Sequence, residues 1–150
     1  NPQLNCICTP GAIAKYHRKI SGPLLDRIDL HIEVPNVDVG KLGEKAGSGL
    51  ESEAVKKRVE QARSRQHERF RAEGIATNSA MALRELKNYC RLDEASREVL
   101  ARAYEKFAMS VRSYYRTIKL SRTIADLAGA ENISTEHILE ALQYRPRVEV

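Results

Sequence analysis

One stretch near the N-terminus shows a strict two-residue alternation of apolar and polar side chains. It runs from Ile28 to Val34, and Pro35 ends it. This period is typical of a half-buried strand, because successive side chains of a strand point to opposite faces. A Ser21-Gly22-Pro23 turn leads into the stretch, and Arg27 stands at its start. We therefore expect a strand that begins beside Arg27. The guanidinium of Arg27 would lie in solvent there, and this planar, always-charged group could reach a phosphate.

A different period begins after residue 50. Residues 36–49 are rich in Gly, Ser and Lys and predict a linker, and the apolar positions beyond them follow a helical repeat. Asn78, Asp93, Ser110 and Ser134 are suitable N-caps, and Gly74 and Gly129 are suitable ends. The pattern predicts helices over residues 51–73, 78–90, 93–107, 110–129 and 134–142. The inward positions expected on the second and third of these helices include Leu83, Leu86, Tyr89, Val99, Leu100, Ala103 and Phe107. The predicted fold is mainly α, with four to five helices packed as a bundle.

The helix expected at 110–129 carries a row of cations. Arg112, Arg116, Lys119 and Arg122 follow each other at helical spacing, and the first acid of the helix is Asp126. A cation in the first turn, such as Arg112, opposes the helix dipole unless an anion docks there. The alternative is a solvated basic face that forms salt bridges with acids on the helix starting at Asp93.

Composition narrows the function classes only modestly. The net charge is +5 and the pI about 9.2, which favours polyanionic partners such as nucleotides or nucleic acid. No apolar run approaches the roughly 20 residues that a membrane-spanning helix needs, so we expect no membrane contact. The sequence opens on Asn1-Pro2 without an initiator Met, which suggests a piece of a longer protein.

The cysteines give a weak metal signal. Cys6 and Cys8 could supply two thiolates to zinc, but a tetrahedral site needs four ligands. Cys90 lies in a helical pattern and is expected in the core. The histidines are scattered without the spacing of metal ligands.

Three segments of this sequence resemble the magnesium-chelatase-like AAA+ ATPases, most closely the competence-protein branch of that family. They are ISGPLLDRIDLHIEV, SVRSYYRTIKLSRTIADLAG and HILEALQYR, and the match covers most of the chain. The resemblance implies that residues 1–35 are the end of an AAA+ nucleotide-binding core, that 36–49 are a linker, and that 50–150 include the helical lid. The family carries a second cysteine pair upstream of the CxCTP motif, so Cys6 and Cys8 would be half of a zinc site.

The resemblance also implies roles for three arginines. The arginine of LLDRID, Arg27, corresponds to the arginine finger that reaches ATP on a neighbouring subunit. Local pairing of Arg27 with Asp26 or Asp29 is the alternative. SVR resembles the sensor-2 motif, which implies that Arg112 contacts the terminal phosphates of the nucleotide. Arg116 is the next candidate for this role.

The parent protein would then be a cytoplasmic ATP hydrolase that uses ATP and Mg and assembles as a homo-oligomeric ring. Because the sequence contains no GxxxxGK[ST] phosphate loop, we expect the chain alone to be inactive and to bind no cofactor tightly. The competence branch implies work on DNA, and the chelatase branch implies metal insertion into a porphyrin. A helical basic DNA-binding module without any link to ATP is the further alternative.

Overall fold

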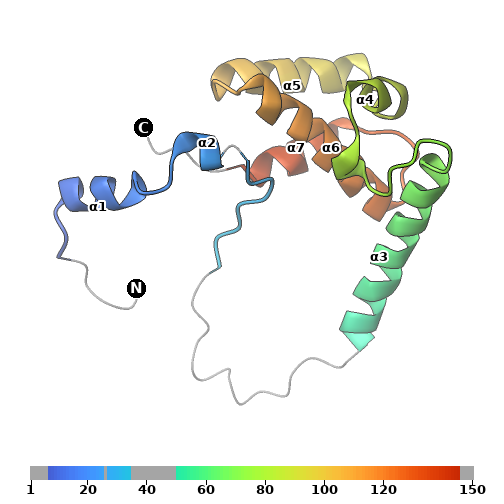
Figure 1. The fold of residues 1–150 in the computed structure, drawn as a ribbon, viewed down its shortest axis with the longest axis horizontal. Coiled ribbons are helices and arrows are strands. Elements are labelled where there is room, and N and C mark those ends of the chain that lie inside the picture. Colours follow the sequence, from blue (N-terminus) through green and yellow to red (C-terminus); the bar gives the residue numbers. More distant parts are fainter. Residues whose placement is uncertain (1–6, 26, 35–49, 146–150) are drawn as a thin grey trace.

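The computed structural model describes residues 7–25, 27–34 and 50–145. The first two ranges form what we call the arm, which contains α1 (Pro10–His17) and α2 (Gly22–Leu25). The third range forms a helical bundle. Its elements are α3 (Leu50–Arg69), the short 3-10 helix η2 (Asn78–Ala80), α4 (Leu83–Tyr89), α5 (Glu94–Lys106), α6 (Val111–Ala128) and α7 (Thr135–Gln143). Figure 1 shows the arm on one side of the bundle and α3 projecting from the other.

The prediction of a helical bundle after residue 50 is confirmed. Between Leu50 and Arg145 the regular elements are all helices, and the β-type pairing found there is an isolated parallel bridge between Leu92 and Ile133. None of the helices in the described ranges is long and apolar enough to cross a bilayer.

Helix α6 lies at the centre of the bundle. It packs against α7, α3 and η2, and α5 packs against α7. The core that these helices enclose includes Phe70, Met81, Leu86, Cys90, Leu100, Ile118, Ala125, Ile133 and Ile138. Burial of this apolar surface is the main source of stability, at about 25 cal/mol per Å² removed from water. Cys90 is part of this core, as expected, and burial raises the pKa of its thiol to about 11.

Both ends of α6 form as the sequence predicts. The Ser110 hydroxyl accepts a hydrogen bond from the Ser113 N–H at 3.1 Å, which satisfies one of the free donors in the first turn. Gly129 ends the helix in the left-handed conformation with φ of 80°. A Cβ placed on Gly129 would lie 3.2 Å from a guanidinium nitrogen of Arg65, so a side chain there meets both backbone strain and a neighbour.

We therefore expect Gly129→Ala to lower the free energy of unfolding by about 1–2 kcal/mol, the cost of a left-handed L-residue. Gly74→Ala is the matched comparison: Gly74 also has a positive φ and should show the same backbone cost, but it has open space at the Cβ position, so any larger loss in Gly129→Ala reports the contact with Arg65. Urea unfolding followed by helical circular dichroism measures both variants. Equal stability of wild type and Gly129→Ala would contradict this account of the end of α6.

Some boundaries and faces differ from the prediction. Asn78 does not cap one continuous helix, because the chain breaks after η2 and α4 starts at Leu83. Asn78 is instead buried, and its side-chain amide donates to Asp126 at 2.8 Å. Leu83 and Phe107, expected inward, are 54% and 53% exposed because they lie at the first residue of α4 and just after the end of α5.

The strand expected at residues 28–34 is not formed in the described part of the chain. The residues run without a pairing strand, and the alternating Ile28, Leu30, Ile32 and Val34 are 46%, 46%, 67% and 81% exposed. A strand needs a neighbour to satisfy its backbone groups. In this segment the His31 N–H instead donates a hydrogen bond to the Tyr144 carbonyl of the bundle, at 2.8 Å.

Candidate functional site

Three of the four predicted cations of α6 line a pocket between α6, η2 and the arm. We call it the basic pocket, and its volume is about 500 Å³. Its walls are Asp29, Leu30, Ser79, Arg112, Tyr115, Arg116, Lys119, Leu120 and Thr123. The cations converge because spacings of four and three residues place Arg112, Arg116 and Lys119 on one face of α6. Arg112 stands in the first turn and is exposed, and that turn contains no acid.

Lys119 is partly enclosed by its neighbours. Its Nζ donates to the Ser79 carbonyl at 3.0 Å. Burial lowers its pKa below the usual lysine range, and the positive charges of Arg116 and Arg112 lower it further. These cations therefore repel one another, and an anion in the pocket would relieve that repulsion.

Arg116 forms an ion pair with the arm. Its Nε lies 2.6 Å from Oδ1 of Asp29, and the two side chains are partly exposed. This pair places the arm segment that follows Arg27 beside the basic pocket. The alternation in the sequence marked Asp29 as outward-facing, but nothing in the pattern pointed to a partner 87 positions later.

Arg27 is exposed, as the sequence predicts. Its Nη1 donates to the Pro23 carbonyl at 3.2 Å, one turn earlier in the chain. Of the two local acids weighed as partners, Asp29 pairs with Arg116 and Asp26 lies outside the described residues.

Arg122 does not belong to the basic face, which corrects the sequence-based interpretation. Its side chain is 3% exposed, and it pairs with the fully buried Asp126 at 3.0 Å. It also donates to the carbonyls of Ala130 and Glu131, both at 2.8 Å. A solvated face bridged to acids of α5 is wrong for this residue, because Arg122 points into the bundle.

Asp126 is the centre of this buried network. Arg69 donates to it at 2.8 Å from α3, and Asn78 donates from η2. Burial alone would raise the pKa of Asp126, but hydrogen bonds from Arg69 and Asn78 and the charge of Arg122 hold that pKa below its usual value. The network ties α3 and η2 to the end of α6 opposite Arg112.

A second, mostly apolar pocket of about 440 Å³ adjoins the basic pocket. The two share Asp29, Arg116 and Leu120, and the second is also lined by Pro23, Leu25, Ile28, Phe107 and Ala108. The Asp29–Arg116 pair thus forms part of the wall between the two pockets.

The thiols give no support for a complete metal site among the residues that the structure describes. Cys8 is exposed and free, and Cys6 lies outside the described residues. No group of three or more candidate ligands gathers anywhere in residues 7–25, 27–34 and 50–145.

Comparison with known families places this geometry in context. Residues 49–145 match the family described as magnesium chelatase, subunit ChlI C-terminal, and residues 1–42 match magnesium chelatase, subunit ChlI. The chain belongs to the magnesium-chelatase-like family. Within it, the first match covers the helical bundle and the second covers the arm.

Individual relatives agree with this assignment. The chain is 39% identical to the competence protein ComM of Haemophilus influenzae over 140 residues, which is 93% of this chain and 27% of ComM. It is 38% identical to YifB of Salmonella typhimurium over 138 residues, 92% of this chain and 26% of YifB. It is 32% identical to Rv2897c of Mycobacterium tuberculosis over 145 residues, 97% of this chain and 28% of that protein. The chain thus spans about a quarter of the length of these magnesium-chelatase-like relatives.

Proposed function

We propose that this chain is the C-terminal part of an AAA+ ATPase and supplies cationic side chains to ATP at the subunit interfaces of a homo-oligomeric ring. The observation that carries the proposal is the basic pocket, in which Arg112, Arg116 and Lys119 converge along the N-terminal half of α6. A concave cluster of cations, one of them in the first turn of a helix, is suited to a compact polyphosphate.

Arg27 is proposed to act as the finger that stabilises charge developing on the γ-phosphate of ATP held by the adjacent subunit. Its exposure and its planar guanidinium suit this role. The Asp29–Arg116 pair brings the segment just after Arg27 against the face of α6 that carries Arg112. Arg27 and the pocket thus lie on neighbouring parts of one subunit, with Arg27 proposed to assist hydrolysis and Arg112 proposed to sense the terminal phosphates.

The residues of the chain fit phosphate better than they fit magnesium. The basic pocket offers three cations and one carboxylate, whereas Mg²⁺ prefers several oxygen ligands. The described ranges contain no cluster of three acids or histidines that could hold a metal ion. No step that we assign to this chain passes through the metal.

The exposed apolar side chains of the arm support its place at the end of a larger α/β core. Ile7, Tyr16 and Val34 are 96%, 70% and 81% exposed, so the arm by itself buries little of the surface of its large apolar side chains. The period-2 pattern at 28–34 would then become a strand only when neighbouring strands of the core pair with it.

The alternative of a basic DNA-binding module is weakened by the geometry. Binding along DNA needs a row of accessible cations, but Arg122 is buried and Arg116 is paired with Asp29. The remaining cations of α6 form a pocket rather than a stripe. Coupling of ATP hydrolysis to DNA remodelling is proposed for the parent because the competence branch implies it. The chelatase alternative, metal insertion into a porphyrin, rests on the family name.

The pocket can be tested on the 150-residue chain with pyrophosphate as the probe. Arg112→Ala is expected to weaken pyrophosphate binding about three- to tenfold, the effect of losing one partly exposed charged hydrogen-bond donor. Isothermal calorimetry at low ionic strength measures it. Arg102→Ala is the matched control, because Arg102 is an exposed arginine of α5 that lines neither pocket.

The same chain is expected to show no ATP turnover, because it lacks a phosphate loop.

Equal loss of pyrophosphate binding in Arg112→Ala and Arg102→Ala would mean that only net charge attracts the anion. Tighter binding of a DNA duplex than of pyrophosphate, with loss on Arg112→Ala, would favour the DNA-binding module.

A further inference from the structure

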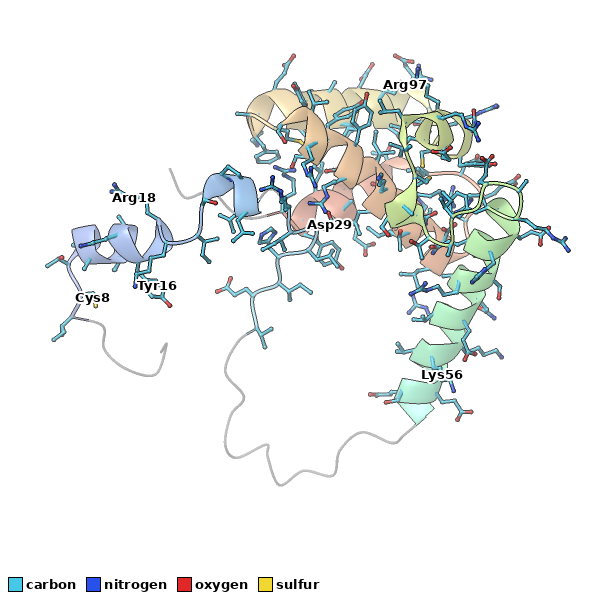
Figure 2. The ribbon with its side chains drawn as sticks, viewed as in Figure 1. Cys8, Tyr16, Arg18, Asp29, Lys56 and Arg97 are labelled. Carbon is cyan, nitrogen blue, oxygen red and sulfur yellow. The ribbon has the colours of Figure 1, made fainter. Side chains whose placement is uncertain are left out.

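Asp29 is an acid in the wall of the basic pocket, which is proposed to bind an anion. It lines both pockets, and among their described lining residues it is the one carboxylate. Its Oδ1 lies 2.6 Å from Nε of Arg116, and its side chain is 46% exposed. Figure 2 shows Asp29 where the arm meets the helical bundle. An acid in this position is unexpected, because it opposes the ligand that the three cations would attract.

The negative charge of Asp29 acts on Lys119 as well as on Arg116. Lys119 responds to it, because the carboxylate raises the lysine pKa while Arg116 and Arg112 lower it. In the absence of another anion, Asp29 therefore partly neutralises the whole cluster. A phosphate entering the basic pocket would compete with this carboxylate for Arg116 and would be repelled by it at short range.

The arm segment is held to the bundle close to this point. Two residues beyond Asp29, the His31 N–H donates to the Tyr144 carbonyl at 2.8 Å. Two residues before Asp29 is Arg27, whose Nη1 contacts Pro23 within the arm. Loss of the Asp29–Arg116 pair would loosen a short stretch of chain that also carries the proposed finger.

We infer that Asp29 is an internal competitor for phosphate at the basic pocket, and that its displacement by phosphate releases the segment that bears Arg27. This inference rests on the proposed function and adds a regulatory link to it. Occupancy of the pocket and the position of Arg27 are then coupled through one ion pair, because the like charges of phosphate and Asp29 repel each other when both lie beside Arg116. Asp29 is a positioning residue in this scheme and does not itself contact the reacting atoms.

The test uses the 150-residue chain with pyrophosphate, comparing wild type, Asp29→Asn and Glu33→Gln. Asp29→Asn is expected to tighten pyrophosphate binding about three- to tenfold, because a like charge at the site is removed. Glu33→Gln removes an equal charge from the same segment but lines neither pocket, so it should leave the affinity close to wild type. Calorimetry measures all three proteins.

Amide hydrogen exchange supplies the second measurement. Pyrophosphate should speed exchange at the His31 amide in wild type, and Asp29→Asn should show fast exchange there without any anion. If wild type binds and Arg112→Ala weakens binding, but Asp29→Asn binds no tighter than Glu33→Gln, the role of Asp29 is overturned and the pocket stands. If neither wild type nor Asp29→Asn binds pyrophosphate, the proposed function and this inference fail together.

Discussion

In a ring-forming protein that carries this chain together with its phosphate loop, Arg27→Ala is expected to lower ATP turnover about 10³- to 10⁵-fold, the range for supplied arginine fingers. Nucleotide affinity should change little, because a finger acts mainly on charge that develops in the transition state. Steady-state hydrolysis and equilibrium binding of a labelled nucleotide measure the two effects separately.

Arg27→Lys and Arg18→Ala are the controls for this prediction. Lysine should restore little activity, because an ammonium cannot reproduce the planar fork of a guanidinium. Arg18 is an exposed arginine just after α1, and Figure 2 shows it in the arm well away from Asp29, so its removal should have little effect. A fall in turnover of less than tenfold for Arg27→Ala would argue that Arg27 is an ordinary surface residue.

The second large effect concerns the buried network under α6. Asp126→Ala is expected to lower the free energy of unfolding by about 3–5 kcal/mol, because it leaves Arg122 and most of Arg69 buried without a counter-charge. Asp126→Asn keeps the shape and should cost less, although it also removes the charge. Urea unfolding followed by circular dichroism measures each variant.

An exposed pair in the same bundle provides the comparison. Glu98 and Arg102 are four residues apart on α5 with side chains 63% and 74% exposed, so Glu98→Gln should cost only roughly 0.5 kcal/mol or less.

The burial of Asp126 also predicts that the stability of the protein depends on pH. Because folding lowers its pKa, its contribution is complete above about pH 4 and is lost as the pH falls further. Asp126→Asn should therefore be less sensitive to acid than wild type, and equal sensitivity would contradict this assignment.

The parts of the fold that the sequence predicted are those fixed by local chemistry. Asp93 caps α5 by accepting from the Ser96 N–H at 2.7 Å, and Ser110 and Gly129 define α6. Each of these depends on a residue type and its immediate neighbours, which a periodic pattern reveals. The helical bundle followed from them because short connections favour packing of consecutive helices.

The parts that were missed depend on contacts between distant residues. Arg122 shares the spacing of the exposed cations, but a buried acid one turn later and two carbonyls draw it inward. Asp29 pairs across the chain with Arg116, and no local pattern encodes such a partner. The period-2 stretch at 28–34 was recognised as strand-like, but an alternating pattern cannot show whether a neighbouring strand is available to pair with it.

The central claim is that this chain supplies Arg27 to a nucleotide held by another subunit, and mixed rings test it most directly. One subunit type carries Arg27→Ala, and the other carries a disabled phosphate loop, so each is inactive by itself. If Arg27 acts across the interface, some junctions in mixed rings join an intact loop to an intact Arg27, and the account predicts that ATP hydrolysis partly returns. Rings that demonstrably contain both subunits but remain inactive would contradict the claim.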